Sequence, residues 1–182
     1  MCTHKRTVIG LTVAALLAAC ATPLMGPREL PQGLNLGRAV TADEIKAWDI
    51  SIPPSGAGLP PGSGSVQQGA AVYAAKCVAC HGANGAGKPV DALVGGQGTL
   101  ASDSPVRTVG SYWPYATTLF DYVRRAMPTN APKSLTDSEV YAVSAYVLQL
   151  NGVIPQDAVM NAQTLPQVKM PNRDGFIDYS GK

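Results

Sequence analysis

Residues 77–81 of the chain read Cys-Val-Ala-Cys-His. Two cysteines separated by two residues and followed at once by a histidine form the pattern of covalent c-type haem attachment. Each thiol can add to one vinyl group of the macrocycle, and the histidine can bind the iron from the side on which the chain is attached. Because the pattern occurs once in 182 residues, we expect one haem c, held by Cys77 and Cys80, with His81 as an iron ligand.

The same cysteines have three other interpretations, and the rest of the sequence argues against each. A structural zinc site needs a second pair of Cys or His residues, but the others, Cys2, His4 and Cys20, all lie within the first twenty positions. A thioredoxin-like redox motif requires a βαβ context, whereas the neighbouring sequence predicts helices. A disulfide between residues three positions apart is strained and uncommon.

The start of the chain has the pattern of an export signal. A basic pair at residues 5–6 precedes an apolar run that ends in small residues. This order is typical of a secretory signal rather than a membrane span. Residues 17–20, Leu-Ala-Ala-Cys, resemble the lipobox of bacterial lipoproteins, whose cysteine is acylated. We therefore expect a lipoprotein signal peptide over residues 1–19 and a lipid anchor at Cys20, with an ordinary cleaved signal as the alternative.

Export agrees with the haem motif, because bacteria attach haem to such motifs outside the cytoplasm. Alanine rather than aspartate follows Cys20, so the lipoprotein resemblance implies an outer-membrane anchor facing the periplasm. If the lipobox is not used, we expect a soluble periplasmic protein. The 14 basic and 12 acidic residues form no basic stripe, which argues against nucleic acid as a partner.

Periodic apolar residues predict three helices in the body of the chain. We expect them over residues 66–81, 115–126 and 136–151, the last beginning at the capping-box sequence Thr-Asp-Ser-Glu. Residues 20–65 form a Gly- and Pro-rich arm, with a short helix after residue 41, and residues 153–182 form a tail with little helical pattern. The sequence thus predicts an all-α domain over residues 66–152.

The second iron ligand decides between electron transfer and chemistry at an open site. Met127 lies between the haem motif and the last helix, where the preceding helix ends before Pro128, so the chain there can pass across the open haem face. Met170 in the tail is the rival ligand. The alternative for Met127 is that it fills the core, as methionines often do.

The residues named so far resemble a class I cytochrome c over positions 66–152. Gly69 and Tyr73 precede the haem motif, Met127 follows it, and the last helix carries Tyr146. In that fold the first and last helices cross closely at a glycine and aromatic residues. Many relatives have Pro-x-Leu-x-Gly after the motif, with a carbonyl that accepts the histidine proton. This chain has Asp-Ala-Leu-Val-Gly at residues 91–95, so we expect its glycine-rich loop to supply that carbonyl.

A narrower resemblance links most of the chain after the signal to the cytochrome subunit of Sox-type sulfur dehydrogenases and sulfite dehydrogenases. It is carried by residues 58–64, 111–119, 124–128, 139–143 and 170–176. The resemblance implies a molybdenum-cofactor dehydrogenase subunit as electron donor, and it implies that the arm and the tail either wrap that subunit or pack on the cytochrome itself. Sox subunits often carry two haem domains, whereas this chain has one motif.

Together these observations predict a periplasmic monohaem electron-transfer protein, not itself an enzyme, that passes electrons to a downstream cytochrome or terminal oxidase. Tyr112 and Trp113 are candidate donors to the haem propionates, because both have a polar edge; simple packing of their loop is the alternative. Two other functions stay open. One is a general periplasmic carrier between another dehydrogenase and a terminal oxidase, and the other is a haem enzyme or gas sensor with an open sixth site.

Overall fold

The computed structural model describes residues 37–177 of the chain, so the predicted signal peptide and Cys20 lie outside the described residues. The chain divides into two units, residues 1–42 and residues 43–182, and the second contains the fold. Its order of elements is α2 (Ala42–Trp48), β1 (Ser63–Ser65), α3 (Val66–Lys76), α4 (Val78–His81), η2 (Ala83–Gly85), α5 (Ala116–Ala126), α6 (Asp137–Leu150), β2 (Val159–Asn161) and η3 (Leu165–Gln167). The predicted helical class is confirmed, with one small sheet added.

Local sequence signals explain where the long helices begin and end. Thr136 and Glu139 form the predicted capping box of α6, in which the side chain of each residue bonds the backbone N–H of the other. Ser65 and Gln68 form a second capping box at the start of α3. Helix α6 ends before Gly152, whose positive φ of 69° suits a glycine beyond a helix end.

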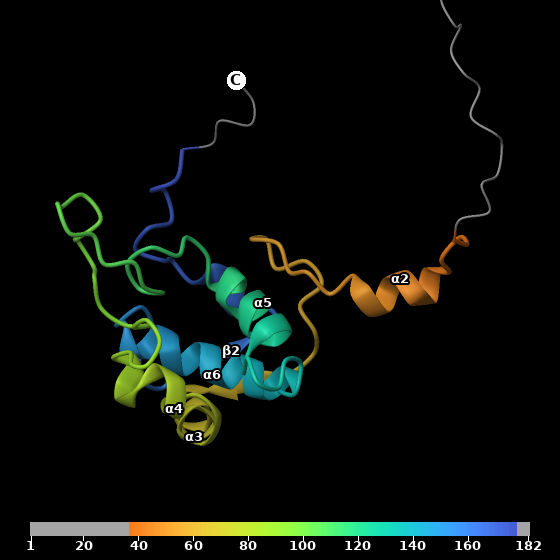
Figure 1. Ribbon diagram of the computed structural model, residues 1–182, viewed down its shortest axis with the longest axis horizontal. Helices are drawn as coiled ribbons and strands as arrows, with labels where there is room; N and C mark the ends of the chain where they lie inside the picture. The colour runs from red at the N-terminus through yellow and green to blue at the C-terminus, as the bar shows by residue number, and fades with distance from the viewer. Residues whose placement is uncertain (1–36, 178–182) are drawn as a thin grey trace, which may run out of the picture. The chain divides into compact units, whose positions relative to one another are not determined.

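Helices α3 and α6 cross at the contact that organises the fold. Figure 1 shows α6 between α3 on one side and α5 on the other. A Cβ at Gly69 would overlap the carbonyl group of Ala142, so only glycine allows the two helices to approach this closely. The Tyr73 and Tyr146 rings pack beside this point with centroids 5.3 Å apart. The crossing fixes α3, and with it the haem motif that directly follows.

The arm and the tail pack against this domain. Strand β1 pairs antiparallel with β2, with Gly64 opposite Met160. Ile52 of the arm is 6% exposed, and its N–H donates to Asp121 Oδ1 of α5 at 2.8 Å. From the tail, Leu165 and Met170 enter the same apolar core. The arm and the tail therefore pack on the helical domain itself, which was one of the two alternatives for these segments.

The apolar core lies where α5, α6, the arm and the tail meet. Phe120 and Tyr141 pack against each other at its centre, with ring centroids 4.4 Å apart and the ring planes tilted by 42°. Burial raises the pKa of Tyr141 to about 12, and the Tyr141 hydroxyl donates to the Pro60 carbonyl at 2.9 Å. Across residues 37–177, every helix is too short or too polar to traverse a bilayer.

Candidate haem site

The pentapeptide Cys-Val-Ala-Cys-His lies at the end of α3 and in the single turn of α4. Cys77 joins the two helices, and its N–H still donates to the Tyr73 carbonyl at 2.9 Å. The N–H of His81 donates to the Cys77 carbonyl at 3.0 Å, which closes the turn. Cys77 and His81 are half-buried, whereas Cys80 is exposed. The helical turn thus presents two thiols and an imidazole from one short, rigid segment.

These three side chains do not meet at one point. In the part of the chain that the structure describes, no three His, Cys, Asp or Glu side chains converge to hold a metal ion. Cys77 and Cys80 are free thiols, and burial raises the pKa of Cys77. The two thiols lie at Cys77, before α4, and at Cys80 within it, so they are three positions apart along one turn.

The imidazole of His81 has an unused buried nitrogen. Its Nδ1 is buried and has no hydrogen-bond partner among the described residues. A buried polar atom without a partner costs about 1–3 kcal/mol. The expectation that the glycine-rich loop supplies a carbonyl to His81 is not met in this structure, in which Nδ1 has no partner among the described residues.

Backbone hydrogen bonds fold the loop after His81 back onto the motif. The N–H of Gly87 donates to the His81 carbonyl at 2.8 Å, and that of Val90 donates to the Cys80 carbonyl at 3.2 Å. The Tyr73 hydroxyl donates to the Gly82 carbonyl at 2.9 Å. Gly82 has a φ of 70°, and a Cβ there would overlap the Gly87 carbonyl oxygen. The turn therefore depends on glycine and holds the histidine in place.

Asn151, which sequence reasoning treated only as a helix end, ties the far part of this loop to α6. Its Nδ2 donates to the Leu93 carbonyl at 3.1 Å, and its Oδ1 accepts from the Gly95 N–H at 3.2 Å. One side chain thus bonds both a backbone carbonyl and a backbone N–H of the loop, as a neighbouring strand would do. The only signal in the sequence was an asparagine directly before a helix-ending glycine.

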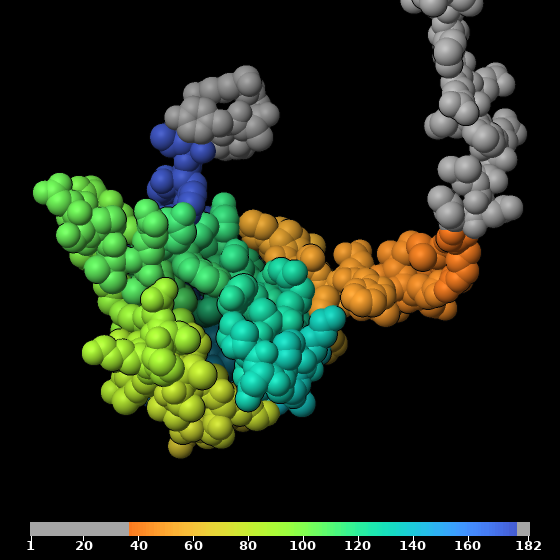
Figure 2. Space-filling model, viewed as in Figure 1, coloured from red at the N-terminus to blue at the C-terminus, as the bar shows by residue number. Residues whose placement is uncertain are grey.

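Met127 lies at the end of α5. Its backbone is extended, with φ −111° and ψ 147°, and its N–H still donates to the Val123 carbonyl. Figure 2 shows the surface hollowed between the part that carries α3 and α4 and the part that carries α5 and the loop after it. Met127 is half-buried. Met170, the rival ligand, is 3% exposed within the apolar core.

The two arginines before Met127 have carboxylate partners. Arg124 Nε lies 2.9 Å from Asp137 Oδ1 at the start of α6, and Arg125 pairs with Asp121 one turn earlier in α5. Hydrogen bonding to Asp121 raises the pKa of Arg125. These pairs fix the end of α5, from which Met127 follows.

Tyr112 and Trp113 lie in the loop that leads into α5. The Trp113 ring packs edge-on against Tyr122 of α5, with centroids 5.7 Å apart. The Tyr112 ring is half-exposed; the Arg107 guanidinium lies 5.6 Å from its centroid and the ring of Phe176 packs against it. Both side chains have protein neighbours, and their role as propionate donors stays a prediction.

Comparisons with known proteins agree with this geometry. The sequence model of the cytochrome c family matches residues 66–151. One chain of the sulfane dehydrogenase SoxCD from Paracoccus pantotrophus is 42% identical and superimposes with a TM-score of 0.75; the match covers 81% of this chain and 73% of that chain. The protein belongs to the cytochrome c family. Within this family it is a class I c-type cytochrome that resembles the Sox cytochromes.

A second relative is the thiosulfate dehydrogenase of Allochromatium vinosum. The two proteins are 30% identical over 129 residues, which is 65% of this cytochrome but only 40% of the dehydrogenase. This cytochrome therefore spans well under half of that enzyme. Membership of the cytochrome c family implies covalently bound haem c and points to electron transfer. The free thiols of Cys77 and Cys80, which lie within one turn of His81, fit that group.

Proposed function

We propose that this cytochrome carries single electrons through one haem c, with Cys77 and Cys80 as attachment points and His81 and Met127 as iron ligands. The position of Met127 in the chain carries the proposal, because it lies in an extended, half-buried segment directly after α5. The part of the surface that carries α5 and the following loop borders the hollow opposite the part that carries α4 (Figure 2). When bound, haem c supplies a one-electron couple, and histidine–methionine ligation raises its potential. The paired arginines and the Gly82 turn hold both ligands on rigid elements, so little rearrangement accompanies electron transfer.

The spectrum of the ferric protein tests the ligands. We expect a low-spin haem with the weak far-red band of methionine-to-iron ligation. Met127→Ala should abolish this band, whereas Met170→Leu should keep it, because Met170 is a core residue and leucine conserves its volume. A high-spin ferric spectrum with rapid cyanide binding would overturn the Met127 assignment and favour the haem enzyme or gas sensor with an open sixth site.

The donor that we propose is a molybdenum-cofactor sulfite or sulfur dehydrogenase subunit. The likeness to a chain of sulfane dehydrogenase, at 42% identity, supports this choice. In this role the cytochrome relays electrons to a downstream cytochrome or terminal oxidase and leaves catalysis to its partner. A purified dehydrogenase of this type should reduce the ferric cytochrome within its own turnover time. Failure to do so would favour the general carrier between another dehydrogenase and a terminal oxidase.

We further propose that the cytochrome works on the periplasmic side of a membrane, anchored through an acylated Cys20. The lipobox-like residues 17–20 and the export that haem attachment requires support this location. Cys20→Ser should move the holoprotein from the membrane fraction to the soluble periplasmic fraction. An unchanged distribution would contradict the anchor but not the electron-carrier role.

A further inference from the structure

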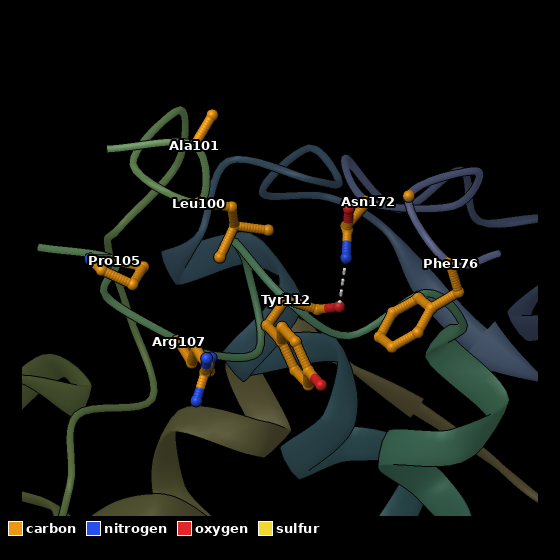
Figure 3. Close-up of a pocket in the computed structure, with 8 residues that line it drawn as sticks. Leu100, Ala101, Pro105, Arg107, Tyr112, Asn172 and Phe176 are labelled. Carbon is orange, nitrogen blue, oxygen red and sulfur yellow. Dashed lines mark hydrogen bonds between the residues drawn. The ribbon is translucent and has the colours of Figure 1, made fainter. Parts of the chain in front are cut away.

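The tail of the cytochrome contacts the loop that precedes α5 through one hydrogen bond, one pair of aromatic rings and one cation–π pair. Asn172 Nδ2 donates to the Tyr112 carbonyl at 2.7 Å, as Figure 3 shows. The Phe176 ring packs edge-on against the Tyr112 ring at 5.2 Å between centroids. The Arg173 guanidinium lies 4.4 Å from the centroid of the Tyr115 ring. A turn of five tail residues thus contacts both ends of the segment 112–115.

The first half of this loop is held by the domain itself. Thr108 Oγ1 donates to the Gly95 carbonyl at 2.6 Å, and Ser111 Oγ donates to the Val106 carbonyl at 2.6 Å. The second half differs, since the side chain that bonds the Tyr112 carbonyl comes from the tail. Trp113, the next residue, packs on Tyr122 of α5, and the part of the surface that carries α5 borders the hollow in Figure 2.

We propose that Asn172 is a positioning residue that holds the Tyr112–Trp113 segment closed over one edge of the haem and thereby keeps water from it. The proposal rests on the proposed function, since it requires a haem in the hollow beside α5. Exposure to water is one of the factors that set a haem potential, and a more polar surrounding stabilises the more highly charged ferric state. Release of this segment should therefore lower the midpoint potential without removing Met127 from the iron.

Gly175 offers an independent way to move Asn172. The Gly175 N–H donates to the Asn172 carbonyl at 3.2 Å, which closes the turn. A Cβ at Gly175 would overlap Asn172 Oδ1. Gly175→Ala therefore forces the Asn172 amide to rotate away from Tyr112 while leaving the amide itself, and the charge of the protein, unchanged.

Redox titration of the holoprotein tests the proposal. Asn172→Leu removes the donor at similar size, and Gly175→Ala displaces it; both should lower the midpoint potential and keep the methionine band. Gln167→Leu makes the same chemical change at an exposed tail position and should leave the potential unchanged. Wild-type potentials in both Asn172→Leu and Gly175→Ala, or an equal fall in Gln167→Leu, would overturn this proposal alone. A wild-type protein without haem would overturn the proposed function and this inference with it.

Discussion

Gly69 of α3 lies directly against the carbonyl group of Ala142 in α6, and a Cβ at position 69 would also come 2.8 Å from the Cβ of Tyr146. The obstacle on the Ala142 side is backbone, which cannot rotate away as a flexible side chain can. Gly64 of β1 meets the same residue, because a Cβ there would overlap the Ala142 backbone. Two glycines from adjacent elements thus share one close approach to α6.

Gly69→Ala should therefore destabilise the protein although alanine is the better helix former. Forcing an extra carbon into a well-packed contact costs about 1–3 kcal/mol, which outweighs the helix-propensity gain of about 1 kcal/mol. Denaturant unfolding of the holoprotein measures the effect. Ala71→Ser adds one atom at an exposed position of the same helix and should change the free energy of unfolding by less than about 0.5 kcal/mol. Equal losses in the two variants would show that the crossing is not close-packed.

The arm should be released when Asp121 is removed. Asp121→Ala leaves the buried Ile52 N–H without its acceptor, and an unsatisfied buried donor costs about 1–3 kcal/mol. Asp121→Asn keeps an oxygen for Ile52 but loses the ion pair with Arg125, so its cost should be smaller. Limited proteolysis should cut the arm near residues 50–54 faster in the alanine variant. Asp157→Ala, at an exposed position, is the matched control. Equal cleavage in all variants would show that the bond from the Ile52 N–H to Asp121 does not hold the arm on α5.

Tyr141 should make the protein less stable at alkaline pH. Its pKa is raised to about 12 by burial, whereas an unfolded tyrosine ionises near 10. The unfolded chain therefore loses this proton first, so stability is full below about pH 10 and falls as the pH rises toward 12, by at most about 1.4 kcal/mol per pH unit. Tyr141→Phe should be less stable at pH 7, because the bond to Pro60 is lost, but should show a shallower alkaline decline. Parallel pH profiles for the two proteins would contradict this account.

Much of the fold was predictable because its signals are local. The pentapeptide at residues 77–81 predicts the haem attachment site from five adjacent positions, and the Thr136–Glu139 capping box marks the start of α6 within four. Apolar spacing predicted α5 with an error of one residue at its start. Signals of this kind depend on backbone geometry over a single turn, so they can be recognised in the sequence without knowledge of the rest of the molecule.

What could not be predicted depends on contacts between distant residues. The pairing of β1 with β2 joins three-residue strands almost a hundred positions apart, too short to show any alternation of apolar residues. The pairing of Arg124 with Asp137 depends on how α5 packs against α6. The absence of a partner for His81 Nδ1 among the described residues depends on the path of a glycine-rich loop. Glycines allow many such paths, so composition alone does not choose among them.

Asn151 is also a residue whose role sequence reasoning missed, and its replacement should loosen the loop that follows His81. Asn151→Asp keeps the oxygen that accepts from Gly95 but loses the Nδ2 donor to the Leu93 and Val147 carbonyls. Asn151→Ala loses both functions. We expect unfolding free energies to fall by about 1 kcal/mol for the aspartate variant and by more for the alanine variant, since each lost bond contributes about 0.5–1.5 kcal/mol. Hydrogen exchange at the Gly95 amide should accelerate only in Asn151→Ala, because only that variant lacks the acceptor. Asn130→Ala, in an exposed loop, should leave the Gly95 exchange rate unchanged, and equal acceleration in both Asn151 variants would show that Oδ1 does not hold the loop.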